Sequence, residues 1–304
     1  MKLSRLFLAG TFAVCAMAFV PAATQTAAAK APPVRYYLAL GDSLSAGFQN
    51  HTISTDRACT DATNDLSGHE GYVCLLYRKL LTVYPNLKVV NLGLAASPGE
   101  DTCSFTTMTT CFGLKPRVDT GLGDVAPYNI NQTSQMAAAL KFLKTHKHAA
   151  PIITIDLGGN DFLPLLGMAL KGDLADAVKA LPATEATAAT NLNMIVKTLH
   201  KAAPKARIAL VNQYNPFSGM PASAIPTQLA AFITQALTQW SASVRHIALK
   251  YHTAYANVYT TFLGEGPVLT NILGPIDYPN IHCNDLGYTK YTDVLEMAYL
   301  RGPV

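Results

Sequence analysis

The stretch Val-Arg-Tyr-Tyr-Leu-Ala-Leu-Gly-Asp-Ser-Leu at residues 34–44 decides the fold. Residues 34–40 form a short apolar run that predicts a buried strand, which Gly41 ends. Runs of the same kind recur at 87–92, 151–157 and 207–212. Apolar residues at helical spacing lie between and after them, over 72–80, 136–143, 192–199, 229–247 and 288–299. This alternation predicts one α/β domain in which helices cover both faces of a parallel sheet.

The composition indicates a globular protein and argues against a nucleic-acid-binding one. Of the 304 residues, 50% are hydrophobic and only 14% are charged, against roughly 25% charged in an average soluble domain. The chain can therefore bury a large core. The net charge is only +4, and no cluster of Lys and Arg interleaved with aromatic residues indicates a nucleic-acid surface.

The N-terminus resembles a secretory signal. Lys2 and Arg5 precede an apolar run at 6–20, and a stretch rich in Ala and Thr follows. The run is shorter than the roughly 20 residues needed to span a bilayer, so we expect no stable membrane anchor. We expect a signal peptide at 1–29, a linker at 30–34 and a domain at 35–304, and a secreted protein (extracellular or periplasmic) that is a monomer.

Export favours disulfide bonds among the five cysteines that lie outside the predicted signal peptide. Pairing of neighbours in the sequence predicts Cys59–Cys74 and Cys103–Cys111, with Cys283 as a free thiol. The chain has no Cys-x-x-Cys motif, and its histidines do not show ligand spacing. We therefore predict neither a metal site nor a cofactor.

Residues with acyl-transfer chemistry follow the predicted strands. Ligands of an open parallel sheet lie beyond the carboxyl ends of its strands. Ser43 follows the first strand, Gly99 lies beyond the second and Asn160 follows the third, while His282 precedes the last helix. Ser43 is the expected nucleophile and His282 its general base. The backbone amides of Ser43 and Gly99 and the side-chain amide of Asn160 would stabilise an oxyanion.

These segments resemble the sequence blocks of the GDSL (SGNH) hydrolase family. Residues 39–45, Ala-Leu-Gly-Asp-Ser-Leu-Ser, are similar to its first block, Gly-Gly-Asn-Asp at 158–161 to its third, and the segment around His282 to its fifth. The second block, Gly-Glu-Asp-Thr at 99–102, has one residue more than usual, which leaves Gly93 as a lesser candidate for the oxyanion donor. The resemblance implies a single-domain, flavodoxin-like α/β/α sandwich of three layers and ester or thioester hydrolysis without a cofactor.

The chain departs from the family beside its histidine. Where the family has an aspartate three residues before the histidine, this chain has Pro279. Two alternatives follow: Asp277 orients the imidazole of His282, or a backbone carbonyl of residues 278–280 accepts the Nδ1 proton. We favour Asp277, because a loop rich in proline can bend it within reach.

Three further interpretations compete with a secreted carboxylic ester hydrolase. An α/β-hydrolase is disfavoured because Gly-Asp-Ser-Leu-Ser at 41–45 lacks the closing glycine of the nucleophile elbow. A carbohydrate-binding or structural protein that has lost catalysis is supported by Pro279 alone, and an acyltransferase would need an acceptor. Small-molecule, lipid and acylated-polysaccharide esters all remain open as substrates.

Overall fold

A computed structural model describes residues 35–49, 52–53, 59, 71–94, 100–111, 133–146, 151–273 and 280–304. The chain divides into two units, Met1–Pro32 and Pro33–Val304, and every described residue belongs to the second. The predicted signal peptide and linker lie outside the described residues, so their boundaries stay predictions. No helix among the described residues is long and apolar enough to cross a membrane.

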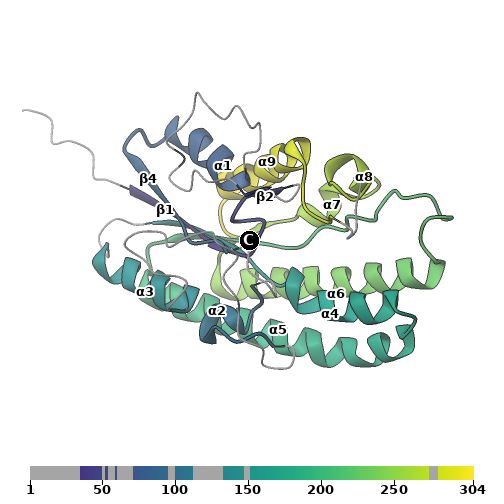
Figure 1. The fold of residues 1–304 in the computed structure, drawn as a ribbon. Coiled ribbons are helices and arrows are strands. Elements are labelled where there is room, and N and C mark those ends of the chain that lie inside the picture. Colours follow the sequence, from purple (N-terminus) through teal and green to yellow (C-terminus); the bar gives the residue numbers. More distant parts are fainter. Residues whose placement is uncertain are drawn as a thin grey trace, which may run out of the picture. The chain divides into compact units, whose positions relative to one another are not determined.

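The described part of the second unit is built on a parallel sheet of five strands (Figure 1). These are β1 (Arg35–Gly41), β4 (Leu87–Asn91), β5 (Ile152–Asp156), β6 (Arg207–Val211) and β7 (Ala254–Ala256), in the order β4-β1-β5-β6-β7. The chain thus moves from β1 outward to β4 and then back past β1 to β5. This order is flavodoxin-like, and its reversal beside β1 is where such folds bind ligands. A small antiparallel hairpin, β2 (Phe48–Gln49) and β3 (Thr52–Ile53), follows β1.

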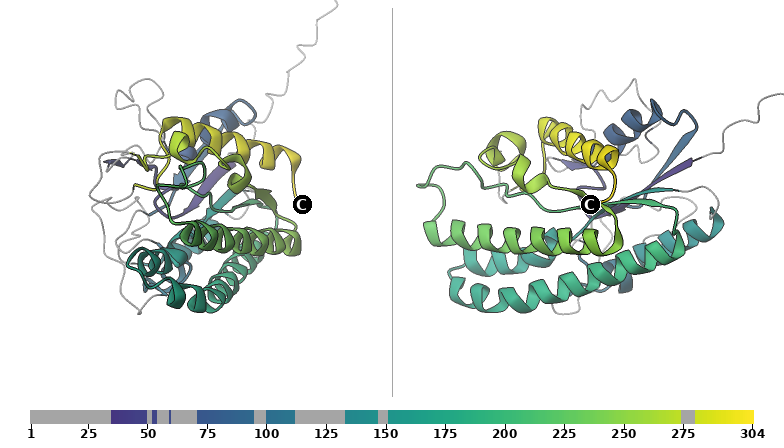
Figure 2. Two further views of the ribbon diagram at one scale, coloured as in Figure 1. Left: turned by 90° about the vertical axis from the view of Figure 1, so that its right-hand side faces the viewer. Right: turned by 180° about the vertical axis from the view of Figure 1, so that it is seen from behind.

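Two layers of helices cover the sheet (Figures 1 and 2). The helices on one face are α1 (Tyr72–Leu81), α7 (Val258–Thr261), α8 (Gly266–Leu269) and α9 (Asp285–Arg301). Those on the other are α2 (Ser104–Thr107), α3 (Gln135–Thr145), α4 (Gly159–Leu170), α5 (Leu174–Ala202) and α6 (Thr227–Tyr251). The predicted α/β/α sandwich is confirmed.

Alternation along the strands creates a separate core on each face of the sheet. In β1, Leu38 and Leu40 pack into the core beneath α3–α6, whereas Tyr37 and Ala39 pack into the core beneath α1 and α9. Successive side chains of a strand point to opposite faces, so a strand between two helical layers is apolar at most of its positions. This explains why the strands appear in the sequence as largely apolar runs.

Strand β7 and helix α4 are among the elements that the sequence did not predict, and helix α5 is longer than predicted. Strand β7 has only three residues, too few for a recognisable apolar run. Helix α5 begins at Leu174, well before the periodic stretch at 192–199, and contains Pro182 and many Ala and Thr residues. Helix α4 begins directly at the Gly-Gly-Asn-Asp segment, so Asn160 lies in the first turn of a helix.

Candidate active site

A tight turn after β1 presents Ser43. Gly41 has a φ of +146°, and a Cβ there would lie 2.2 Å from the carbonyl oxygen of Asp156, so only glycine fits. The backbone N–H of Asp42 donates to that same carbonyl at 3.2 Å. The Asp42 carboxylate accepts a hydrogen bond from the Leu44 N–H at 2.9 Å. Both neighbours of Ser43 are therefore fixed, and the half-buried serine projects from the carboxyl end of β1.

His282 meets Ser43 across the carboxyl ends of the strands. The Nε2 atom of His282 lies 2.8 Å from Ser43 Oγ, although 239 positions separate the two residues. This distance is within reach for proton transfer from a serine to a general base. The ring of Phe48 packs on the imidazole with a centroid separation of 4.4 Å.

The other nitrogen of the His282 ring faces the side chain of Asn280. Nδ1 lies 3.0 Å from Asn280 Oδ1, and the backbone N–H of His282 donates to the same oxygen at 3.2 Å. A backbone N–H can only donate, so the amide atom facing it is the oxygen. Nδ1 must then carry the proton, which leaves the lone pair of Nε2 directed at the Ser43 hydroxyl. Asn280 thereby selects the tautomer in which His282 can act as a base.

Hydrogen bonds on both sides hold the segment that carries His282. Tyr214 Oη donates to the Ile281 carbonyl at 2.7 Å. The backbone N–H of Asn271 donates to the His282 carbonyl at 2.9 Å, and its side-chain amide donates to the Cys283 carbonyl at 3.2 Å. The segment contains no helix or strand of its own, so these contacts replace regular secondary structure in positioning the imidazole.

Asn160 lies on the same rim, where α4 begins. Its Nδ2 donates to the Glu100 carbonyl at 2.9 Å. The next residue, Asp161, accepts from the Thr102 hydroxyl at 2.7 Å and from the Thr102 N–H at 3.1 Å. These bonds fasten the loop that follows β4 to the first turn of α4. Burial, together with the charge of Asp101, raises the pKa of Asp161 to about 7.

Of the other predicted site residues, the structure describes Gly93 but neither Gly99 nor Asp277. Gly99 and Asp277 lie outside the described residues, as does Pro279. Gly93 is described, and its N–H donates to Asn91 Oδ1 at 2.9 Å, which disfavours it as an oxyanion donor. The sequence did not identify Asn280: we considered a carboxylate or a backbone carbonyl as the partner of Nδ1, not a side-chain amide.

Two buried carboxyl groups lie beneath Ser43. Asp156 is fully buried at the end of β5 and accepts from Gln213 Nε2 at 2.8 Å and from Tyr291 Oη at 2.7 Å. Burial raises its pKa to about 7, although these two hydrogen bonds oppose the shift. Burial, and then the charge of Asp156, raise the pKa of Asp42 well above its usual range. Both shifts favour the protonated, neutral form of the carboxyl group.

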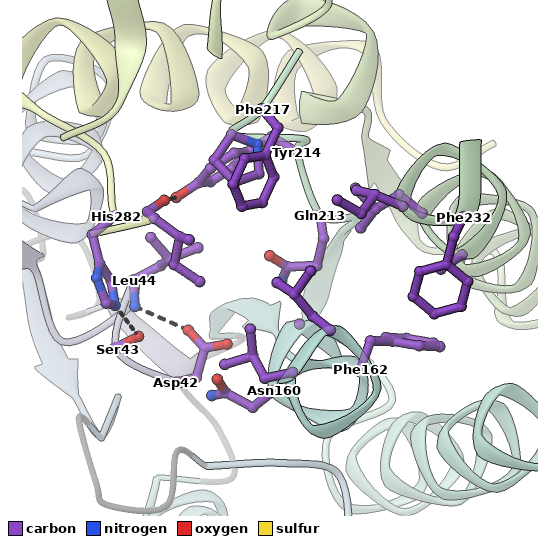
Figure 3. Close-up of a pocket in the computed structure, with 18 residues that line it drawn as sticks. Asp42, Ser43, Leu44, Asn160, Phe162, Gln213, Tyr214, Phe217, Phe232 and His282 are labelled. Carbon is purple, nitrogen blue, oxygen red and sulfur yellow. Dashed lines mark hydrogen bonds between the residues drawn. The ribbon is translucent and has the colours of Figure 1, made fainter. Parts of the chain in front are cut away.

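An apolar pocket opens beside Ser43 and His282. Asp42, Ser43, Asn160, Gln213 and His282 supply most of its polar lining. The rest is largely aliphatic and aromatic and comes from α4, α6 and the segment after β6. Figure 3 shows the Ser43–His282 pair at one side of this pocket, and Phe162 and Phe232 at the other.

The cysteines follow the predicted pairing. The structure contains the disulfides Cys59–Cys74 and Cys103–Cys111. The thiol of Cys283 is free and buried, and burial raises its pKa, so it is not a reactive thiolate at neutral pH. Asp101, Cys103 and Cys111 lie close together, but the sulfur atoms of this group are joined in a disulfide and do not form a metal site.

One family model matches most of this chain. The model of the GDSL-like lipase/acylhydrolase family matches residues 39–290, which include the turn that carries Ser43, the start of α4 and the His282 segment. The chain belongs to this family. The resemblance seen in the sequence is confirmed, and membership places the protein among hydrolases. No curated protein matches the chain.

Solved structures of two lipases and a phospholipase share the fold. An extracellular lipase from Streptomyces rimosus superposes with a TM-score of 0.55 at 18% identity, covering 87% of this chain and 100% of the lipase. Phospholipase A1 from Streptomyces albidoflavus NA297 superposes with a TM-score of 0.56 at 15% identity, and the match covers 87% of this chain and 99% of the phospholipase. The lipase Lip_vut3 from a goat rumen metagenome superposes with a TM-score of 0.55 at 16% identity, and the match covers 87% of this chain and 97% of the lipase. At these identities the likeness establishes the three-layer fold alone.

Proposed function

We propose that this GDSL-family hydrolase is a secreted carboxylic ester hydrolase with Ser43 as nucleophile and His282 as general base. One observation carries the proposal: Ser43 Oγ lies 2.8 Å from His282 Nε2. The opposite ring nitrogen has an acceptor that leaves Nε2 unprotonated. A chain that had lost catalysis would have no need for this tautomer.

The first half-reaction follows from this arrangement. Ser43 Oγ attacks the ester carbonyl carbon while its proton passes to His282 Nε2. The negative oxygen of the tetrahedral intermediate needs donors already in position. The side-chain amide of Asn160, which is half-buried on the pocket wall, and the amides of Ser43 and Gly99 are the proposed donors. His282 then gives its proton to the leaving alcohol.

The second half-reaction reverses these roles. A water molecule transfers a proton to Nε2 and attacks the acyl-enzyme carbonyl, and Ser43 leaves with that proton. During both transition states the ring is an imidazolium, and its Nδ1–H donates to Asn280 Oδ1. This oxygen belongs to a neutral amide, so it orients and partly stabilises the cation, without the charge that an aspartate would supply. A contribution from Asp277 remains part of the proposal, to be tested separately.

The disulfides support export, because such bonds persist in oxidising compartments. They agree with the signal peptide predicted at 1–29 and with action outside the cytoplasm. We propose small-molecule, lipid or acylated-polysaccharide esters as substrates of a monomeric enzyme without a metal or cofactor.

Ser43→Ala tests the proposal directly. Purified wild type should hydrolyse p-nitrophenyl butyrate, and a fluorophosphonate should label it once, on Ser43. The variant should lose at least a thousandfold in kcat and all labelling while its circular dichroism spectrum is unchanged. A tenth of the wild-type kcat in a folded Ser43→Ala protein would remove Ser43 from its proposed role. A test with an alcohol acceptor would reveal any acyltransferase activity.

A further inference from the structure

The pocket beside Ser43 continues as an apolar channel between α4 and α6. Six residues define it: Phe162 and Leu166 from α4, and Phe232, Ile233, Ala236 and Leu237 from α6. None of these side chains carries a charge or a polar group. Such an apolar wall would not stabilise a bound sugar and is longer than a short acetyl group requires, because apolar surface favours the binding of apolar groups.

The two helices run in opposite directions along this channel. A Cβ on Gly158, which caps α4, would collide with the indole of Trp240. The rings of Phe162 and Trp240 are 5.7 Å apart. The beginning of α4 therefore lies beside Trp240, near the later part of α6. Moving outward from Asn160 along α4 corresponds to moving back along α6, from Trp240 through Ala236 to Phe232.

Helix geometry sets the length of the channel. Leu166 follows Asn160 by six positions and Phe232 precedes Trp240 by eight. At about 1.5 Å per residue the channel wall extends roughly 9–12 Å from the catalytic rim. An extended chain advances about 1.2 Å per bond, as three backbone bonds of a polypeptide span about 3.5 Å. The channel thus accommodates roughly seven to ten bonds.

The position of His282 determines which half of an ester enters the channel. The leaving oxygen must receive its proton from His282 Nε2, so the alcohol lies on the histidine side of Ser43. The acyl substituent then points away from His282. In Figure 3 that direction leads past Gln213 toward Phe162 and Phe232.

We propose that this channel binds the acyl chain and makes the enzyme selective for unbranched acyl esters of roughly eight to eleven carbons, with Ala236 as a residue that keeps the channel open. The inference rests on the proposed function, because it requires an acyl group on Ser43. Ala236 is buried with an exposed fraction of 5% and lies between the rim and Phe232 on α6. A larger side chain there shortens the channel.

The test measures kcat/KM for p-nitrophenyl esters from C2 to C16, below their critical micelle concentrations. Burial of each added methylene is worth up to about fourfold, so octanoate should exceed butyrate at least tenfold, and palmitate should fall below octanoate. In the Ala236→Phe variant, the ratio of kcat/KM for the octanoate ester to kcat/KM for the butyrate ester should drop at least tenfold. The matched control is Ala231→Phe, which changes an exposed alanine of the same helix and should keep the wild-type ratio.

A second variant covers the case in which Ala236→Phe does not fold. Leu166→Trp fills the channel from the half-buried side of α4 and should lower the same ratio. Wild type that prefers acetate or butyrate would overturn the inference, as would unchanged ratios in both folded variants. The inference would also be overturned if kcat/KM increased with the length of the alcohol in a series of alkyl acetates and not with the length of the acyl chain. Failure of the proposed function looks different: no ester of any length is hydrolysed and a fluorophosphonate does not label Ser43.

Discussion

Replacing Asn280 by alanine tests how this enzyme orients its histidine. The substitution removes the oxygen that lies 3.0 Å from His282 Nδ1 and 3.2 Å from the His282 backbone nitrogen. A hydrogen bond to a charged partner is worth about 1.5–3 kcal/mol and a neutral one about 0.5–1.5 kcal/mol. The bond is neutral in the free enzyme and charged in the transition state, so its loss raises the barrier by the difference, about 1–1.5 kcal/mol.

This difference corresponds to a decrease in kcat/KM of roughly tenfold. The aspartate of a serine-protease triad is worth about 10⁴ in the equivalent experiment, so the two arrangements are clearly distinguishable. Asn280→Asp should instead move the acid limb of the kcat/KM profile to higher pH, because a carboxylate beside the ring favours the imidazolium. Both variants are assayed with a p-nitrophenyl ester between pH 5 and 9.

Asn271→Ala is the control for a merely structural effect. Asn271 holds the same segment through backbone carbonyls and does not contact the imidazole nitrogens. Its pH profile should keep the wild-type shape. Activity of Asn280→Ala within twofold of wild type would refute the assigned role of Asn280, as would an Asn280→Asp profile that does not move.

Three further predictions concern the oxyanion, the loop acid and the buried carboxyls. Asn160→Ala should lower kcat by about 10²–10³ with KM within twofold, because an oxyanion donor acts mainly in the transition state; steady-state kinetics showing a change in KM alone would contradict this. Asp277→Asn should lower kcat/KM by well over tenfold if Asp277 also supports His282, and a value within threefold of wild type would leave Ser43, His282 and Asn280 as the working set. Asp156 has a pKa raised to about 7 by burial, so the folded protein binds more protons than the unfolded one between about pH 4 and 7, and the free energy of unfolding falls as pH rises through that window, by up to about 4 kcal/mol. Urea unfolding of Asp156→Asn should therefore show a weaker decrease with pH than wild type or the exposed control Asp176→Asn, and equal slopes would refute the assignment.

The sheet was predictable because its strands are buried on both faces. Apolar runs at 34–40, 87–92, 151–157 and 207–212 match β1, β4, β5 and β6 to within one residue at each end. Such a strand leaves a continuous signal in the sequence. Strand β7 lies at the edge of the sheet and has three residues, so it leaves almost none.

The sequence did not identify Asn280 as a partner of His282, for a chemical reason. A sequence search for an orienting group looks for a carboxylate at a fixed spacing, and Pro279 occupies that position here. Any oxygen that accepts a hydrogen bond from Nδ1 can set the tautomer, so residue type alone did not single out Asn280. The deciding fact is geometric: the backbone N–H of His282 and its ring meet the same side-chain oxygen.

Helix α4 has two roles, and α6 shares only one of them. Its first turn carries Asn160, and its next turns carry Phe162 and Leu166 on the channel wall. A change that tilts α4 to suit a different acyl chain therefore also displaces the proposed oxyanion donor, whereas α6 contributes to the wall alone. Redesign of the enzyme for other acyl lengths should begin on α6, where selectivity can change while the catalytic rate is preserved. The same asymmetry predicts that natural relatives diversify faster along α6 than along the first turns of α4.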